Sequence, residues 1–402
     1  MTTLLYQIPA LYRPAGMERV LCMKVNWLAE QRDAAGEPEY RIVIATTDQR
    51  GRTNTFPLNP AIETVDLGID YEENNGKSFL NKFIHFPGKQ LRHKKALRQL
   101  IINVQPDIVI SMFGNDAAFV PSVVAEVNRQ RTATEQLRPI KTVLEVHFSR
   151  FKRIQYARKG LFALADRLRS RGDLKTAARY DRFVVLTEED KTYWGNGLPN
   201  MEVIPNPRTY KPENQSQLTN KTVLACGRYS HQKGFERLID AWAEIMGNGE
   251  NKASSPFHDW VLRIAGDGEN RPAMEQQIEN LGLRGSVVLG PSSDMSQEYL
   301  NAGIFALSSR YEGLPMVLLE AQAFGLPIVA FECKCGPRDV VTDGVDGFLV
   351  PEGDSTALAA ALRKLMADET LRRSMGAKAL QNSEKYDVES VMKRWKNLFE
   401  RL

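Results

Sequence analysis

Short apolar runs alternate with stretches of helical periodicity from one end of the chain to the other. The apolar runs within residues 41–46, 106–111 and 182–187 are typical of strands that are buried on both faces of a parallel sheet. Between residues 92 and 104, apolar side chains recur at helical spacing and basic side chains occupy the opposite side. Strands that alternate with helices of this length predict right-handed βαβ units. We therefore expect an α/β fold with open, doubly wound sheets.

One segment interrupts this alternation. Residues 204–217 contain three prolines and a polar run that can continue neither a strand nor a helix. The alternation restarts near residue 222, and a chain of 402 residues is long for a single core. These observations predict two Rossmann-like domains, residues 1–205 and 206–385, that face each other across a cleft.

The composition is that of a soluble globular protein, with 43% hydrophobic and 25% charged residues. No window approaches the roughly 18 apolar residues that a membrane span requires, and the N-terminus lacks the features of a signal peptide. We therefore expect a cytoplasmic chain. The four cysteines have no zinc-site spacing and are expected to be reduced thiols. A net charge of +4 does not indicate nucleic-acid binding.

The most informative segment follows the strand predicted at residues 304–308. Pro315 suits the first position of a helix, and the first N–H groups of that helix favour a phosphate. The helix is apolar on nearly every side, so the carboxylate of Glu320 is costly unless it accepts hydrogen bonds. We expect Glu312 and Glu320 to accept them from ligand hydroxyls, and a salt-bridged structural role is the alternative. The ligand contacts expected in this segment are Glu312, Gly313, Leu314, Pro315, Met316, Val317 and Glu320.

Two cations follow the strand predicted at residues 222–226. Arg228 and Lys233 flank a loop from which a guanidinium and an ammonium could both reach a diphosphate. Such a clamp would stabilise the charge that develops on a nucleoside diphosphate as it leaves. Isolated basic loop residues are usually solvated, but the carboxyl end of a parallel strand is where these folds bind ligands.

Three motifs together resemble those of the family 4 retaining glycosyltransferases, which have the twin-Rossmann architecture called GT-B. They are Gly-Arg-x4-Lys-Gly at 227–234, Gly-Asp-Gly at 266–268 and Glu-Gly-Leu-Pro-x4-Glu at 312–320. The resemblance implies that Arg228 and Lys233 hold the diphosphate of the donor. It also implies that Glu320 binds the nucleotide ribose and that Glu312 binds the hydroxyls of the transferred sugar.

The first half resembles the family more loosely. Gly16 lies in the loop before the first helix, where the family usually has two glycines, and Ala15 occupies the first position. His147 follows a strand and matches a histidine that the family places beside the donor sugar. An ordinary loop glycine and a structural histidine are the alternatives. The resemblance also implies that the closing helix, residues 386–402, crosses back to the first domain.

The function implied by the resemblance is that of a retaining hexosyltransferase in glycan or polysaccharide biosynthesis. It would move a hexose or N-acetylhexosamine from a nucleotide-diphosphate sugar to a saccharide or lipid-linked saccharide. The segment at residues 334–341 resembles one found in relatives that transfer hexoses or N-acetylhexosamines, which favours a UDP-linked donor. Because the family is thought to work by same-face substitution, we expect no protein nucleophile, no metal and no cofactor besides the nucleotide-sugar co-substrate. The expected catalytic residues are Glu312, His147, Arg228 and Lys233.

Positive charge gathers in the first half. Eight Lys or Arg residues and one acid lie between residues 150 and 171, and six basic residues without an acid lie between 82 and 98. Phe148 and further apolar side chains up to residue 162 are interleaved with the first cluster. Solvated helix faces are one interpretation. Attraction to an anionic membrane surface is the other.

Three other functions are alternatives to sugar transfer. A nucleotide-sugar epimerase has the same architecture, but the spacing of Glu312 and Glu320 argues against it. A non-catalytic nucleotide-sugar-binding protein would bind UDP without turnover. A nicotinamide dehydrogenase would need Gly-x-Gly-x-x-Gly after its first strand, and this motif is absent.

Overall fold

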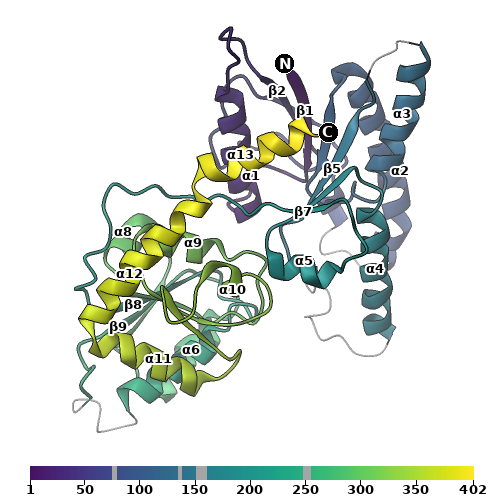
Figure 1. Ribbon diagram of the computed structural model, residues 1–402. Coiled ribbons are helices and arrows are strands. Elements are labelled where there is room, and N and C mark those ends of the chain that lie inside the picture. The colour runs from purple at the N-terminus through teal and green to yellow at the C-terminus, as the bar shows by residue number, and fades with distance from the viewer. Residues whose placement is uncertain (75–78, 135–137, 151–160, 248–254) are drawn as a thin grey trace. The chain divides into compact units, whose positions relative to one another are not determined.

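The chain forms two α/β units in the computed structural model, which describes residues 1–74, 79–134, 138–150, 161–247 and 255–402. Unit 1 comprises Met1–Leu186, Lys191–Ile204 and Met392–Leu402, and unit 2 comprises Thr187–Asp190 and Pro205–Val391. Each unit is built on one parallel sheet with helices packed against it (Figure 1). The expected α/β fold with two doubly wound sheets is confirmed.

Within the described residues, the sheet of unit 1 has seven parallel strands. Neighbouring strands β1 and β4 are hydrogen-bonded, and the direction in which strands are added reverses between them. This reversal is the topological switch point, where open α/β sheets bind ligands. In spatial order the strands are β3 (Glu63–Asp66), β2 (Tyr40–Thr46), β1 (Thr2–Ile8), β4 (Ile108–Ser111), β5 (Lys141–Glu145), β6 (Arg182–Val185) and β7 (Met201–Val203).

Helices cover both faces of this sheet (Figure 1). One face carries α1 and the end of the C-terminal helix α13, and the other carries α2 and α3. Leu97 and Ile101 of α2 and Val124 of α3 pack in one cluster with Leu5 and Val109 of the sheet. The helices are α1 (Gly16–Glu30), α2 (Phe79–Val104), α3 (Val120–Thr134), α4 (Leu161–Ala177), α5 (Glu188–Trp194) and α13 (Val388–Glu400), with a 3-10 turn, η1 (Tyr71–Asn74).

The described part of unit 2 contains a sheet of six parallel strands with its switch point between β8 and β11. The strands, in spatial order, are β10 (Val287–Gly290), β9 (Val261–Ala265), β8 (Thr222–Cys226), β11 (Ile304–Leu307), β12 (Ile328–Phe331) and β13 (Gly347–Val350). The helices are α6 (Phe235–Met246), α7 (Arg271–Asn280), α8 (Met295–Leu300), α9 (Met316–Ala323), α10 (Pro337–Val340), α11 (Ser355–Ala367) and α12 (Glu369–Ser383), with a 3-10 turn, η5 (Glu384–Tyr386).

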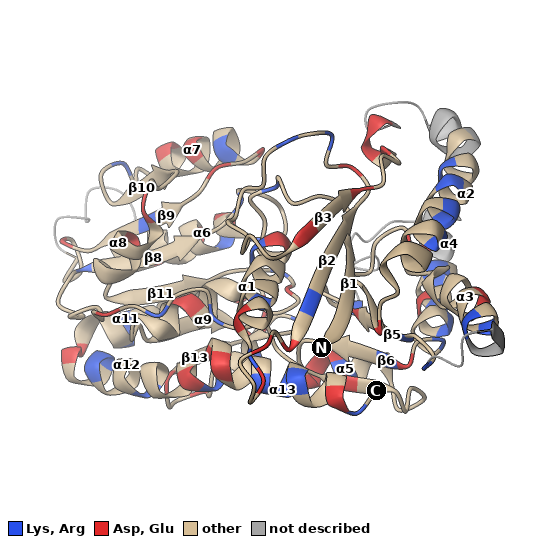
Figure 2. Cartoon of the chain, turned by 90° about the horizontal axis from the view of Figure 1, so that it is seen from above, with Lys and Arg blue, Asp and Glu red and all other residues tan. Residues whose placement is uncertain are grey.

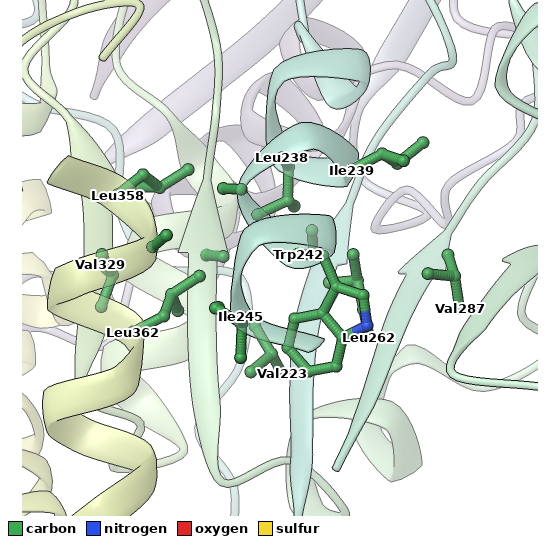
Figure 3. Close-up of a cluster of buried hydrophobic side chains, with 14 of the residues drawn as sticks. Val223, Leu238, Ile239, Trp242, Ile245, Leu262, Val287, Val329, Leu358 and Leu362 are labelled. Atoms are coloured by element: carbon green, nitrogen blue, oxygen red, sulfur yellow. The ribbon is translucent and has the colours of Figure 1, made fainter. Parts of the chain in front are cut away.

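The core of unit 2 is organised around Trp242 of α6, which is fully buried (Figure 3). Its apolar neighbours include Val223 and Leu262 from the sheet, and Leu358 and Leu362 of α11 belong to the same cluster. Full burial of an aromatic or leucine side chain contributes roughly 1.5–3 kcal/mol. This packing holds β8 and β9 firmly, so the loops at their carboxyl ends start from a rigid base.

The polar segment that precedes β8 is bound to unit 2. Arg208 Nη2 lies 2.8 Å from Asp387 Oδ2, and the Arg208 amide donates to the carbonyl oxygen of Tyr386 at 2.7 Å. Further along, the Ser216 amide donates to the carbonyl oxygen of Phe324 at 2.9 Å. Side chains of this segment are therefore held against α9 and the end of α12.

Pro315 corrects one expectation. It lies one residue before helix α9, with φ −72° and ψ 97°, and is therefore the N-cap. The interpretation of Pro315 as the first helical residue is wrong because its ψ is extended, although its fixed φ suits the turn into the helix.

None of the four cysteines forms a disulfide, as expected. Among the helices of the described residues, none is both long and apolar enough to span a membrane.

Candidate functional site

Two loops containing glycine pack backbone against backbone at the carboxyl ends of β8 and β9. A Cβ atom on Gly266 would lie 2.0 Å from the carbonyl oxygen of Gly227, and one on Gly268 would lie 2.5 Å from that of Tyr229. Gly266 and Gly268 have φ values of +156° and +157°, which other residues rarely adopt. The loops can therefore meet only without these side chains. Arg228 projects from this support, is exposed, and has no ion pair with any residue that the structure describes.

Lys233 and Glu312 form an ion pair that joins the loop after β8 to the loop after β11. Lys233 Nζ lies 2.7 Å from Glu312 Oε1, and the two side chains are 18% and 8% exposed. The lysine side chain runs along Gly227, whose Cβ would lie 3.2 Å from Lys233 Cε. Burial lowers the pKa of the Lys233 amine, but the Glu312 carboxylate outweighs it and the pKa is raised. Lys233 is therefore charged at neutral pH.

Glu320 is buried and accepts hydrogen bonds from two hydroxyl groups of the protein. The Tyr299 hydroxyl of α8 donates to Glu320 Oε2 at 2.7 Å, and Thr209 Oγ1 donates to Oε1. A carboxylate has about four lone-pair positions, so one that accepts from protein hydroxyls can also accept from a ligand. The sequence predicts the hydroxyls of a ligand as donors, and the structure shows hydroxyls of the protein in contact with this carboxylate. Its contact with a ligand remains a prediction.

Cys226, the last residue of β8, links Glu320 to Lys233. Its Sγ lies 3.4 Å from the Tyr299 hydroxyl. Burial and, to a lesser extent, the nearby Glu320 raise the pKa of the Cys226 thiol, Lys233 lowers it, and the net pKa is about 12. Both charged groups therefore lie near the end of this strand. No ion pair or hydrogen bond joins Arg228 to any of them in the described part of the chain.

The amino end of α9 lies between the two glutamates in the sequence. The N–H groups of Met316 and Val317 belong to its first turn, where no intrahelical acceptor exists. The preceding loop is packed tightly, since Gly336 has a φ of +100° and its Cβ would lie 2.3 Å from Pro315 Cδ. The backbone of Gly313 and Leu314 is close to the same glycine. This geometry holds the helix terminus in place.

The two residues predicted in the first half both lie in unit 1. Gly16 is the first residue of α1, and a Cβ on it would meet nothing within 4 Å, so the space around it is open. His147 follows β5, is largely buried, and has its Nε2 3.0 Å from Glu145 Oε1. Glu145 in turn binds Lys24 of α1. The sequence predictions did not include Glu145.

Four further residues were missed by sequence reasoning. Tyr299 and Thr209 carry no signal in the sequence that points to Glu320. Lys24 carries such a signal, because it lies at helical spacing in the apolar stripe of α1, where a charged side chain is unexpected. In the structure it is 1% exposed. Glu18, in the first turn of α1, is also buried, its Oε2 has no partner within the described residues, and burial raises its pKa.

The basic clusters are described only in part. Residues 151–160 lie outside the described residues. The membrane role predicted for Phe151 and Tyr156 is therefore not tested by the structure. Phe148 is half-buried, and its ring packs edge-on against that of Phe113 with the ring centroids 5.1 Å apart. Figure 2 shows Lys and Arg along α2, where Leu91 is 56% exposed. Leu168 of α4, between two exposed arginines, is exposed to the same extent.

Among the residues the structure describes, no group of three or more His, Cys, Asp or Glu side chains could hold a metal ion.

Comparisons with known proteins find glycosyltransferases and also an exopolysaccharide phosphotransferase of Streptomyces coelicolor. Residues 207–382 match the family model described as glycosyl transferases group 1. The chain is 36% identical over 229 residues to the amylovoran biosynthesis glycosyltransferase AmsD of Erwinia amylovora. The matched segment covers 54% of this chain and 62% of the relative. It is 32% identical over 308 residues to an uncharacterized glycosyltransferase of Haemophilus influenzae, covering 76% of this chain and 79% of the relative. The chain thus spans less than two thirds of AmsD, and it spans 24% of another curated relative.

A solved structure has the same fold. The structure of HepE from Anabaena with UDP and glucose has a TM-score of 0.65 and 17% identity, and each chain covers 100% of the other. The two-unit architecture is therefore the GT-B fold.

Proposed function

Because the chain belongs to the group 1 glycosyl transferases, we propose that it transfers a hexose or N-acetylhexosamine from a nucleotide-diphosphate sugar with retention of configuration. UDP is the favoured nucleotide and GDP the second choice. The proposed acceptor is a saccharide or lipid-linked saccharide. The AmsD relative named for amylovoran biosynthesis and the HepE complex with UDP and glucose support this choice.

The Lys233–Glu312 ion pair carries the proposal. A lysine that is mostly buried, fully charged and held at the carboxyl end of β8 is suited to an anion rather than to solvent. The exposed Arg228 stands on the same loop, and its guanidinium has no competing ion pair in the described residues. Together with the free N–H groups at the start of α9, these cations would hold the diphosphate of the donor.

The two glutamates are assigned to hydroxyl groups of the donor. The carboxylate of Glu320 already accepts from protein hydroxyls, and we assign the hydroxyls of the nucleotide ribose to the same group. Glu312 uses one oxygen for Lys233, so its other oxygen would accept from the transferred sugar. The proposal assigns His147 of unit 1 to the same sugar.

The proposed chemistry needs no protein nucleophile. The bond between the anomeric carbon and the β-phosphate oxygen breaks, and the acceptor oxygen bonds to the same face of that carbon. The proton of the acceptor hydroxyl passes to the leaving phosphate. The protein contributes position and charge stabilisation, which Arg228, Lys233 and the helix terminus supply. Because these groups take the role that a divalent ion would have, we propose that turnover persists in EDTA.

The acceptor proposal extends to a membrane surface. Exposed leucines at positions 91 and 168 stand among exposed basic residues of α2 and α4. Apolar side chains surrounded by cations suit an anionic lipid surface, which would present a lipid-linked acceptor. Vesicles containing anionic lipid should retain the protein at low salt and release it at high salt. Equal retention by neutral vesicles would refute this part of the proposal.

Calorimetry and donor turnover test the main proposal. UDP should bind more tightly than GDP or ADP, and UDP-sugars should be hydrolysed slowly when water is the acceptor, in EDTA as well. Arg228→Met should weaken UDP binding by about 10- to 150-fold, the value of one charge-assisted hydrogen bond. The matched control is Arg284→Met, which removes an exposed arginine whose ion pair, within the described residues, is with Glu279. If no nucleoside diphosphate binds, or if both variants bind UDP equally well, the proposal is wrong.

A further inference from the structure

A buried charged network surrounds His147 in unit 1. Glu145, the last residue of β5, is 1% exposed, and Lys24 Nζ lies 2.6 Å from each of its carboxylate oxygens. His147 Nε2 lies 3.0 Å from Glu145 Oε1, within hydrogen-bonding distance. Neither ring nitrogen makes a hydrogen bond of standard geometry with any described residue, Glu145 included. The contact between Glu145 and the imidazole is therefore an electrostatic one at hydrogen-bonding distance.

Lys24 is enclosed on its remaining sides by aromatic rings. Its Nζ lies 3.5 Å from the ring centroid of Trp395 on α13 and 5.9 Å from that of Tyr6 on β1. A cation over an aromatic face is stabilised by the ring quadrupole, and more strongly when water is excluded. The C-terminal helix therefore closes the pocket in which Lys24 meets Glu145.

Glu145 stays ionised in this pocket. Burial raises the pKa of its carboxyl group, but Lys24 and His147 outweigh burial, and the pKa is lowered to about 2. An ionised carboxylate accepts hydrogen bonds and cannot donate them. If the ring donates its Nε2–H to Glu145, the Nδ1 lone pair is left as an acceptor for a ligand hydroxyl.

A buried ion pair is a poor source of stability. Apolar residues of similar volume usually replace such a pair at no loss, because removing both charges from water is costly. Lys24 nevertheless interrupts the apolar stripe of α1, between Val20 and Leu28. The Lys24–Glu145 pair is therefore better explained by a role other than stability. The imidazole of His147, which contacts Glu145, indicates what that role is.

We propose that Glu145, held ionised by Lys24, is a positioning residue that fixes the tautomer and orientation of His147. The inference rests on the proposed function, because it matters for turnover only if His147 contacts the transferred sugar. The orienting contact keeps Nε2 protonated and turned toward Glu145. Nδ1 is then fixed as the acceptor for a sugar hydroxyl.

Two double variants test the inference, because either single change would leave a buried charge without its partner. The amide double variant, K24M/E145Q, removes both charges but keeps an oxygen that can accept from Nε2–H. The apolar double variant, K24M/E145L, removes the acceptor as well. Thermal unfolding followed by circular dichroism checks that both variants fold. Neither variant alters the residues of unit 2 that are proposed to hold the nucleoside diphosphate, so the affinity for UDP should stay the same in both.

Proton NMR of the imidazole N–H groups detects the contact between His147 and Glu145. This measurement does not depend on sugar transfer. The chain has five histidines, and the His147 signal is assigned by its loss in His147→Gln. The wild type and the amide double variant should show a downfield N–H of His147 that is protected from exchange, and the apolar double variant should lack it. If the signal is absent from the wild type, or persists in the apolar double variant, the inference is refuted.

Turnover gives the second result. Misplacing a contact group can cost on the order of 100-fold, so kcat should fall by about that factor in the apolar double variant and by less than about fivefold in the amide double variant. Equal kcat values in the two variants would refute the positioning role. If the wild type transfers no sugar, the proposed function fails, and the NMR result still decides whether Glu145 orients His147.

Discussion

Glu320→Gln separates a ligand-binding role of this carboxylate from a structural one. In the folded protein Glu320 accepts from Tyr299, whose hydroxyl is buried, and from Thr209. The amide of a glutamine keeps one oxygen for the Tyr299 hydroxyl, and its NH2 group can donate to Thr209. The free energy of unfolding should therefore change by less than about 1 kcal/mol, because the hydrogen bonds are exchanged rather than lost.

Nucleotide binding should respond differently. Charge-assisted hydrogen bonds contribute about 1.5–3 kcal/mol each, so removing the charge that meets the ribose hydroxyls should raise the Kd for UDP by about 10- to 150-fold. Glu320→Ala would not separate the two roles. It leaves the buried Tyr299 hydroxyl without its acceptor, at a cost of about 1–3 kcal/mol, and would lower the melting temperature as well.

Calorimetric titration with UDP and thermal unfolding make this comparison. The matched control is Glu244→Gln, which removes a half-exposed carboxylate of α6 that pairs with Arg363 in the same unit. The control should bind UDP as the wild type does. A Kd within threefold of the wild type, together with a large fall in melting temperature, would show that Glu320 is structural and that the ribose assignment is wrong.

The remaining predictions concern three other positions. Gly266→Ala should lower both the melting temperature and UDP affinity, because its Cβ would lie 2.0 Å from a backbone oxygen of the facing loop; unchanged titration and melting curves would contradict the packing described. Lys233→Met should cost about 3–5 kcal/mol in urea unfolding, since it leaves the buried carboxylate of Glu312 unpaired. Adding Glu312→Gln should restore stability but not UDP binding. Burial raises the pKa of the Asp116 carboxyl group to about 6 from the ordinary value of 3.8. The stability contributed by the neutral carboxyl group is therefore full below pH 4 and is lost as pH rises through 6. Asp116→Asn should therefore be more stable than the wild type above pH 6, by about 3 kcal/mol, and no more stable below pH 4; parallel pH–stability curves would refute this.

The fold class and the motif segments could be predicted from the sequence because their signals are local. Apolar runs of strand length that alternate with helical periods allow few topologies once right-handed crossovers are required. The positions of Arg228 and Lys233 follow in the same way, since a loop after a buried parallel strand lies at the carboxyl edge of its sheet. The start of α9 was misplaced by one residue, because a proline sets φ but leaves ψ to the surrounding packing.

The partners of the charged groups could not be predicted. Glu320 is 21 residues from Tyr299 and 111 from Thr209, and nothing in the local pattern marks either hydroxyl as its donor. The ion pair of Lys233 and Glu312 joins two loops 79 residues apart. Such pairs depend on strand order and register, which local periodicity does not specify.

The sequence by itself therefore determined the alternating architecture, the loops that carry the cations, and the helix whose amino end is free. Tertiary structure alone decided what each buried charge meets. Lys24 and Glu145 are 121 residues apart, and Trp395 arrives from the last helix of the chain to cover the lysine. The physical reason is that the cost of burying a charge is set by its neighbours in space, while periodicity along the chain records only which face of an element is buried.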